Sequence, residues 1–218
     1  PDAFAQQRLV VDLVSRRLPK SYGYDPLRDI QVITPAKQGP LGTRELNRLL
    51  QGKLNPPERG KGEATLMGRT LREGDKVMQI RNNYDIIWQQ PDGTAGTGIF
   101  NGDMGIIEML DPGSKTIQVR FEEKLATYSF ENQDQLEHAY AVTVHKSQGS
   151  EFEAVVMPLE RRHPKLHYRN LLYTAVTRAR KLLIMTGQKE TVYAMVQNNR
   201  RTLRYTNQKE MLQEMCDE

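Results

Sequence analysis

One polar segment, residues 145–151, combines side-chain types that can bind phosphates. It reads His-Lys-Ser-Gln-Gly-Ser-Glu and follows the apolar run 139–144. A short apolar run of this kind predicts a buried strand. The polar residues after it should then lie at the carboxyl edge of a sheet, where open α/β sheets bind their ligands. Taken singly, His145 could be a structural histidine, Lys146 a solvated cation and Gly149 a turn residue.

A second segment, residues 170–181, places cations at the end of a predicted helix. Its apolar residues Leu171, Leu172, Ala175 and Val176 have helical spacing and would bury one face. That helix would carry Arg178 and Arg180 to its end, just before the apolar run 182–185. Cations there can stabilise the helix dipole, or they can act on the charge of a bound phosphate.

Together the two segments resemble the fifth and sixth conserved motifs of superfamily 1 helicases, and the first resembles the RecD-like branch. Exodeoxyribonuclease V alpha subunits belong to that branch. Segment 31–42 resembles its fourth motif region, and segment 74–105 resembles its inserted SH3-like barrel. The resemblance implies the C-terminal part of an ATP-dependent DNA helicase that uses ATP and Mg²⁺ and unwinds with 5′-to-3′ polarity.

The resemblance also implies roles at an ATP site. Arg178 would be the arginine finger, which neutralises charge on the γ-phosphate in the transition state. Gly149 would let the backbone approach the nucleotide, and Glu151 would accept hydrogen bonds from the ribose or organise the site. Three further residues are assigned to this site by position: Gln148, Lys37 and Arg180.

A single-stranded DNA track is implied beside that site. Thr143 and His145 match family positions that contact the phosphate backbone of the strand, and Lys146 lies next to them. Hydroxyl, imidazole and ammonium donors can position a strand without reading its sequence.

The predicted barrel has one edge that could contact the same strand. It mixes cations, amides and an aromatic ring, which suit phosphates and bases: Lys76, Arg81, Asn82, Asn83 and Tyr84. Of these, Arg81 and Tyr84 are the main candidates for DNA contact. Alternatively, Arg81 is an ordinary solvated residue and Tyr84 packs on the hairpin.

The sequence lacks the other half of an ATPase site. It contains no Gly-x-x-x-x-Gly-Lys-Ser/Thr segment and no acidic pair after an apolar strand. We therefore expect ATP and Mg²⁺ to be held mainly by an N-terminal motor domain of the same parent protein, and we expect this chain alone to be inactive. The absence of an initial Met fits such a piece of a longer protein. With a single cysteine, Cys216, neither a disulfide framework nor a multi-cysteine zinc site is expected, and no metal ligands are assigned.

The predicted elements form an α/β fold, a RecA-like parallel-sheet motor domain that is P-loop NTPase-like but lacks the P-loop, with an inserted small antiparallel SH3-like β-barrel. Strands are predicted at 30–34, 139–144, 154–159 and 182–186, and helices at 4–18, from a capping Thr43, at 166–180 and at 190–199. Alternation of strand and helix predicts a parallel sheet covered on both sides. Short strands at 76–81, 105–110, 116–121 and 127–130 predict the barrel, with a mobile glycine-rich loop from Tyr84 to Phe100. We thus expect residues 1–71 and 132–218 to form the motor domain and 72–131 the barrel.

Composition limits the class of protein. The chain has 218 residues, of which 38% are hydrophobic, and a net charge of +4. This mild basicity is compatible with a nucleic-acid partner but does not require one. No apolar run approaches the roughly 20 residues that span a bilayer, so we expect a cytoplasmic protein without a membrane partner. The expected partners are single-stranded DNA, the N-terminal motor domain and, as a further candidate, other recombination or repair subunits.

Two other interpretations compete with the helicase. The first is a non-catalytic DNA- or protein-binding module, in which a barrel adaptor sits on an α/β platform that never touches nucleotide. The paired motif segments argue against it. The second is a nuclease subunit, but no carboxylates with metal-binding spacing support cleavage by this chain.

Overall fold

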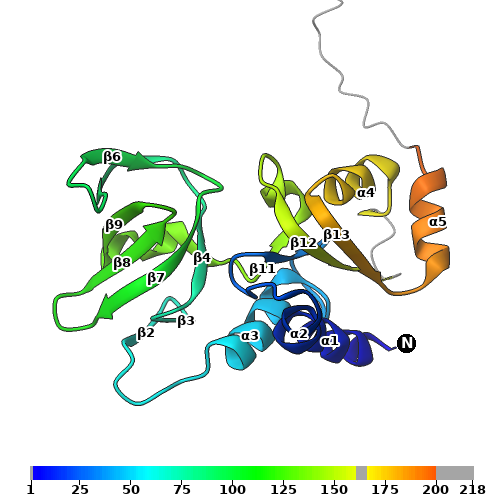
Figure 1. Ribbon diagram of the computed structural model, residues 1–218, viewed down its shortest axis with the longest axis horizontal. Coiled ribbons are helices and arrows are strands. Elements are labelled where there is room, and N and C mark those ends of the chain that lie inside the picture. Colours follow the sequence, from blue (N-terminus) through cyan, green and yellow to red (C-terminus); the bar gives the residue numbers. More distant parts are fainter. Residues whose placement is uncertain (1, 161–165, 200–218) are drawn as a thin grey trace, which may run out of the picture.

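The computed structural model describes residues 2–160 and 166–199. Cys216 and the end of the predicted motor domain, residues 200–218, lie outside that range. Two sheets lie side by side along the long axis of Figure 1. One is a parallel sheet in the order β11-β1-β12-β13, and the other is an antiparallel sheet in the order β10-β4-β7-β8-β9-β5-β6. The predicted α/β class, with an antiparallel sheet inserted into a parallel one, is confirmed.

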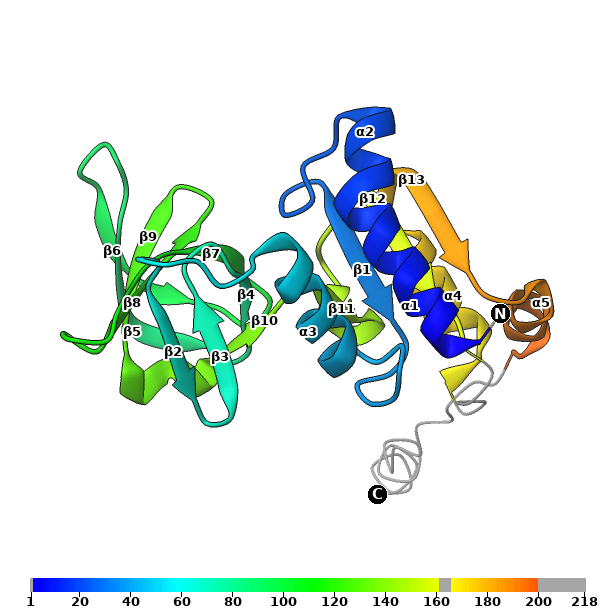
Figure 2. The ribbon, with the colours of Figure 1, turned by 90° about the horizontal axis from the view of Figure 1, so that it is seen from below.

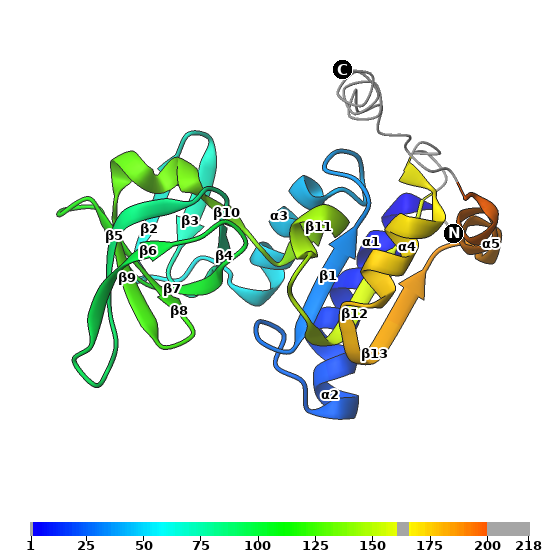
Figure 3. The ribbon, with the colours of Figure 1, turned by 90° about the horizontal axis from the view of Figure 1, so that it is seen from above.

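The parallel sheet is covered on both faces, as predicted. Its strands are β1 (Ile30–Thr34), β11 (Ala141–Thr143), β12 (Phe152–Pro158) and β13 (Ala179–Thr186). One face packs against α1 (Ala3–Asp12), the π-helical turn η1 (Leu13–Arg17), α2 (Leu18–Tyr22) and α3 (Thr43–Leu54). The other packs against α4 (Arg169–Val176) and α5 (Lys189–Gln197). In Figures 2 and 3, α1 and α4 accordingly lie on opposite sides of β12.

The start of α3 differs from the prediction. Gly42, and not Thr43, occupies the N-cap position, and Thr43 is the first helical residue. A β-carbon at Gly42 would lie 2.5 Å from the carbonyl oxygen of Gln38. The turn between β1 and α3 is therefore too tight for a capping side chain, and only glycine fits there.

The antiparallel sheet curls around its own core. Its strands are β4 (Lys76–Gln79), β5 (Asn83–Gln89), β6 (Ala95–Ile99), β7 (Met104–Asp111), β8 (Thr116–Phe121), β9 (Lys124–Ser129) and β10 (Leu136–His138). The hairpin of β2 (Glu63–Leu66) and β3 (Arg69–Arg72) packs on that core, and the 3₁₀ turn η2 (Phe130–Gln135) leads into β10. We call this sheet with its hairpin the barrel. Its strands continue on both sides of 72–131, and the division at those residues stays a prediction.

The predicted mobile loop from Tyr84 to Phe100 is instead the hairpin of β5 and β6, so that prediction is wrong. One of its glycines, Gly96, serves packing. A β-carbon at Gly96 would lie 2.5 Å from the indole ring of Trp88 on the opposite strand. The absence of a side chain at Gly96 lets the Trp88 ring lie across the hairpin. In the sequence alone, such a glycine cannot be told from one in a flexible loop.

Strand β4 lies between the two cores, which explains why each of its residues is buried. Val77 packs in the barrel core, whereas its neighbour Met78 packs against the parallel sheet. Lys76 is only 4% exposed. The prediction that Lys76 forms part of a DNA-facing edge is therefore wrong, because the strand that carries it has no solvent face.

Asp75, just before β4, ties the barrel to the parallel-sheet domain. Its side chain is fully buried and accepts hydrogen bonds from Gln51 on α3 and from Asn55 at the C-cap of that helix, both at 2.7 Å. Three further groups contact the same carboxylate: the Tyr140 hydroxyl at 2.9 Å, the Arg72 amide at 2.9 Å and the His138 ring nitrogen Nε2 at 3.1 Å. A buried carboxylate with several hydrogen bonds fixes the geometry of the groups around it. The chain passes between the two domains twice, after α3 and after β10, and residues of both connections therefore contact Asp75.

Within residues 2–160 and 166–199, no helix is both long enough and apolar enough to cross a membrane.

Candidate nucleotide and nucleic-acid site

The connection from β11 to β12 runs from the edge of the parallel sheet where the strands end, the carboxyl edge, to the edge where they begin, the amino edge. Thr143 pairs with Thr34 at the carboxyl end of β1, whereas Ala154 pairs with Ile30 at its amino end. The chain passes through the 3₁₀ turn η3 (Val144–Ser147) and must return to the amino edge, because parallel strands start at the same edge. The prediction that all of 145–151 lies at the carboxyl edge is therefore wrong for its second half. The segment contributes to two separate clusters.

Arg178 is the centre of the cluster at the amino edge. It lies between α4 and β13, and its half-buried guanidinium donates to the carbonyl oxygens of Ser150 and Thr174, both at 3.1 Å. Its own carbonyl accepts from the Phe152 amide at 2.9 Å. In the described part of the chain, no carboxylate pairs with Arg178. Its charge is held in place by neutral acceptors and remains available to an anion.

The other members predicted for this site surround Arg178. Glu151 and Arg180 form an ion pair, with Oε2 and Nε 3.1 Å apart, and both side chains are more than half exposed. Such an exposed pair contributes little stability and can open for a ligand. Gln148 and Gly149 are exposed, and Gly149 has a φ of +86°. That left-handed backbone requires glycine even though a β-carbon there would meet no atom within 4 Å.

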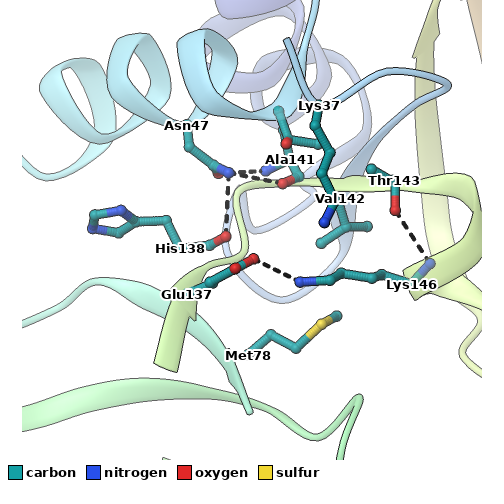
Figure 4. Close-up of a pocket in the computed structure, with 10 residues that line it drawn as sticks. Lys37, Asn47, Met78, Glu137, His138, Ala141, Val142, Thr143 and Lys146 are labelled. Atoms are coloured by element: carbon teal, nitrogen blue, oxygen red, sulfur yellow. Dashed lines mark hydrogen bonds and ion pairs between the residues drawn. The ribbon is translucent and has the colours of Figure 1, made fainter. Parts of the chain in front are cut away.

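The carboxyl-edge cluster is shown in Figure 4. Lys37, Thr143 and Lys146 line one small cleft together with Glu137, which the sequence did not single out. The Lys146 ammonium lies 2.6 Å from Oε2 of Glu137, and the Thr143 hydroxyl accepts weakly from the Lys146 amide at 3.4 Å. Partial burial tends to raise the pKa of Glu137, but its hydrogen bond with Lys146 and the nearby cations outweigh burial and lower that pKa. Lys146 is thus paired with Glu137 in this state.

Asn47 of α3 supports the same cleft. Its side chain accepts from the amide of Ala141 at 2.8 Å and donates to the Ala141 carbonyl at 2.9 Å. It therefore satisfies the outer side of the edge strand β11, where no neighbouring strand does so. This support fixes the strand that presents Thr143.

The structure separates two residues that the sequence assigned to one site. Lys37 lies at the carboxyl end of β1 with Thr143 and Lys146, whereas Arg178 immediately precedes the amino end of β13. His145 is exposed on η3 itself and does not line the cleft. The cleft thus brings together Lys37 and two of the DNA candidates, Thr143 and Lys146, whereas the other nucleotide candidates lie at the opposite edge.

The barrel presents an exposed aromatic pair. Tyr84 is 66% exposed and meets Phe100 edge to face, with ring centroids 5.6 Å apart. Arg81 forms an ion pair with Asp134 at 2.9 Å. Sequence reasoning missed Phe100. Its position directly before the turn residues Asn101 and Gly102 could have indicated it, because a strand is expected to end there beside the segment that carries Tyr84.

Among the residues that the structure describes, no group of three or more His, Cys, Asp or Glu side chains could hold a metal ion.

Two protein families match the chain. The ATP-dependent RecD-like DNA helicase SH3 domain matches residues 46–121, and the UvrD-like helicase C-terminal domain matches residues 138–186. The first match spans most of α3 and most of the barrel. The second spans both clusters, including Thr143 and Arg178.

Individual relatives agree with these matches. The ATP-dependent RecD2 DNA helicase of Deinococcus radiodurans is 35% identical over 158 residues, which cover 72% of this chain and 20% of that protein. The RecBCD enzyme subunit RecD of Buchnera aphidicola subsp. Schizaphis graminum is 26% identical, over 78% of this chain and 26% of that protein. The chain thus spans about a quarter or less of these relatives. A solved structure of Bacteroides Pif1 bound to single-stranded DNA is 18% identical, with a TM-score of 0.47, over 83% of this chain and 46% of that one. The chain belongs to the RecD-like superfamily 1 helicases and contains their SH3 domain and UvrD-like C-terminal region.

Proposed function

We propose that this chain is the C-terminal part of an ATP-dependent DNA helicase, in which it completes an ATP site and carries part of a single-stranded DNA track. The observation that carries the proposal is the state of Arg178. A half-buried guanidinium that has no carboxylate partner among residues 2–160 and 166–199, beside an exposed glycine turn, is suited to receive the charge of a phosphate.

At the amino edge, Arg178 acts as the arginine finger on a nucleotide that a separate N-terminal motor domain holds. A finger acts chiefly on charge that develops in the transition state, so it contributes to turnover more than to nucleotide affinity. Glu151 and Arg180 open their exposed ion pair to contact or organise the nucleotide, and Gly149 keeps the backbone close to it. ATP and Mg²⁺ are held mainly by the other domain.

At the carboxyl edge, Thr143, His145 and Lys146 contact the phosphates of a single strand. Lys37 lines the same cleft, which favours a role for it in DNA contact over its predicted role at the nucleotide. Segment 144–151 joins the two edges directly, so movement at the nucleotide can reach the strand within one connection. We propose 5′-to-3′ movement along DNA, as in the family that the motifs resemble.

The test compares the purified chain with the full-length helicase that we propose contains it. The chain alone should bind single-stranded oligonucleotides with an affinity that falls as salt rises, since phosphate contacts release counterions. It should hydrolyse no ATP with or without DNA, whereas the full-length protein should show DNA-stimulated hydrolysis. DNA-stimulated turnover by the chain alone would overturn the proposed half-site. DNA binding without any turnover in the full-length protein would favour the non-catalytic binding module.

A further inference from the structure

Lys76 places a cation where neither the barrel core nor the proposed DNA track uses one. Its ammonium lies 3.3 Å from the carbonyl oxygen of Ile30, to which it donates, and 5.8 Å from the ring centroid of Phe152. Burial lowers the pKa of Lys76 to about 8, although the charges of Asp25 and Asp29 act in the opposite direction. Burying this ammonium costs free energy because its hydration is lost, a cost that an apolar side chain at the same place would not have.

The two contacts of Lys76 reach two different strands of the parallel sheet. Ile30 begins β1 and Phe152 begins β12, so the ammonium bridges their amino ends from the barrel strand β4. The preceding residue, Asp75, binds α3 in a different direction. Asp75 and Lys76 therefore attach the start of β4 to the neighbouring domain at two separate places, one at α3 and one at the amino ends of β1 and β12.

Phe152 extends this contact to the candidate nucleotide site. Its amide donates to the carbonyl of Arg178 at 2.9 Å, and its neighbour Glu151 pairs with Arg180. The chain of contacts from Lys76 through the Phe152 ring to the Arg178 peptide is continuous. Such a chain can transmit a displacement only if its contacts hold the two ends in a fixed relation.

We propose that Lys76 is a positioning residue that fixes the barrel on the amino ends of β1 and β12 and ties the orientation of the barrel to the peptide that carries Arg178. This role is independent of the proposed function. Only its consequence for ATP turnover rests on Arg178 acting as a finger.

The orientation of the barrel can be measured between two spin labels on the purified chain. Cysteines replace the exposed residues Asp92, at the tip of the β5–β6 hairpin, and Asn170, on α4, in a Cys216→Ser background. Lys76→Met keeps an unbranched side chain, one atom shorter, without the charge, and Phe152→Leu removes the ring but keeps Lys76. The matched control is Lys124→Met, which removes another cation over an aromatic ring, 4.8 Å from the centroid of Trp88 but within the barrel.

Wild type and Lys124→Met should give one narrow distance distribution, whereas Lys76→Met and Phe152→Leu should broaden or shift it. An unchanged distribution in a folded Lys76→Met protein would overturn the proposal. If Lys76→Met fails to fold, Phe152→Leu tests the same contact, since an unchanged distribution in that variant removes the contact from any positioning role.

Amide hydrogen exchange at Phe152 tests the tie to Arg178 separately. Between about pH 7 and about pH 9 Lys76 loses its proton, and the global free energy of unfolding then rises. A fall of about threefold or more in the protection of this amide, corrected for the intrinsic rate, is expected in wild type and in Lys124→Met and would therefore report local opening at the lost contact. Lys76→Met should show no such pH-dependent change. A wild-type protection that does not change across this range would contradict the tie, and neither measurement depends on ATP hydrolysis.

Discussion

The guanidinium of Arg178 donates a hydrogen bond to the main-chain carbonyl of Ser150 across a distance of 3.1 Å. This contact joins the end of α4 to the turn before β12. The same guanidinium also donates to the Thr174 carbonyl and the Thr177 hydroxyl. All three acceptors are neutral. Each neutral bond contributes about 1 kcal/mol net, and bonds to a charged phosphate are roughly twice as strong. Under the proposed function, Arg178 can therefore exchange these partners for a phosphate when a second domain closes on it.

Removing the carboxylate of Glu137 should release Lys146 for DNA. We expect Glu137→Gln to tighten single-strand binding a few-fold and to steepen the salt dependence by about 0.7 in the log–log slope for one added phosphate contact. The matched control is Glu108→Gln, because Glu108 pairs with Arg120 on the barrel at a similar exposure. Fluorescence anisotropy across a salt series measures both effects. Weaker or unchanged binding by Glu137→Gln would show that Lys146 does not contact the strand.

The aromatic pair of the barrel should contribute to strand binding. Arg81→Ala combined with Tyr84→Ala should weaken single-strand affinity about tenfold in low salt, because one stacked base contributes roughly 1–3 kcal/mol. Basal DNA-free ATPase of the full-length protein should remain nearly intact.

A control for that variant is Tyr193→Ala with Arg120→Ala, since Tyr193 on α5 is as exposed as Tyr84. Equal affinities of the two double variants across the salt series would assign this edge of the barrel to structure or to a protein partner.

Lys76 should also make the stability of the chain depend on pH. Its pKa in the fold, about 8, lies below the ordinary value of 10.5. Between these values the unfolded chain binds more protons, so the free energy of unfolding should rise with pH, by roughly 3 kcal/mol over the full window. Below about pH 8 both states are protonated and the burial cost is present in full.

Lys76→Met should lack this rise. Urea unfolding of both proteins at several pH values from 7 to just below 10 measures the difference between them. A wild type and a Lys76→Met protein with parallel pH dependences would show that the ammonium is not desolvated in the fold.

The sequence was sufficient where one local pattern decides the structure. The apolar run that begins at Ile30 formed β1 with the predicted bounds, and the spacing of Leu46 and Leu50 placed α3 on the sheet. Ile30, Leu46 and Leu50 are all buried in one core. Their pattern is visible without knowledge of the tertiary structure.

The sequence failed where two separate parts of the molecule meet. Lys76 looks like a solvated strand residue until β4 is known to lie between two cores. Gly96 looks like a flexible position until Trp88 is known to cross it. Glu137 and Lys146 are on different elements, and only the fold brings them within 2.6 Å. The direction of segment 144–151 likewise follows from the strand order, which local patterns do not contain.

The most direct test of the account is the effect of Arg178→Ala on the full-length helicase, measured as ATP turnover and as nucleotide affinity. Turnover should fall about 10³-fold or more, with nucleotide affinity changed by less than about threefold, because the guanidinium acts on the transition state. Arg169→Ala is the matched control, since Arg169 begins the helix α4 that precedes Arg178 and also donates to a main-chain carbonyl, that of Val196; it should leave both quantities unchanged. Comparable losses of affinity and turnover in Arg178→Ala, or turnover near that of the wild type, would contradict the central claim that this chain supplies the arginine finger.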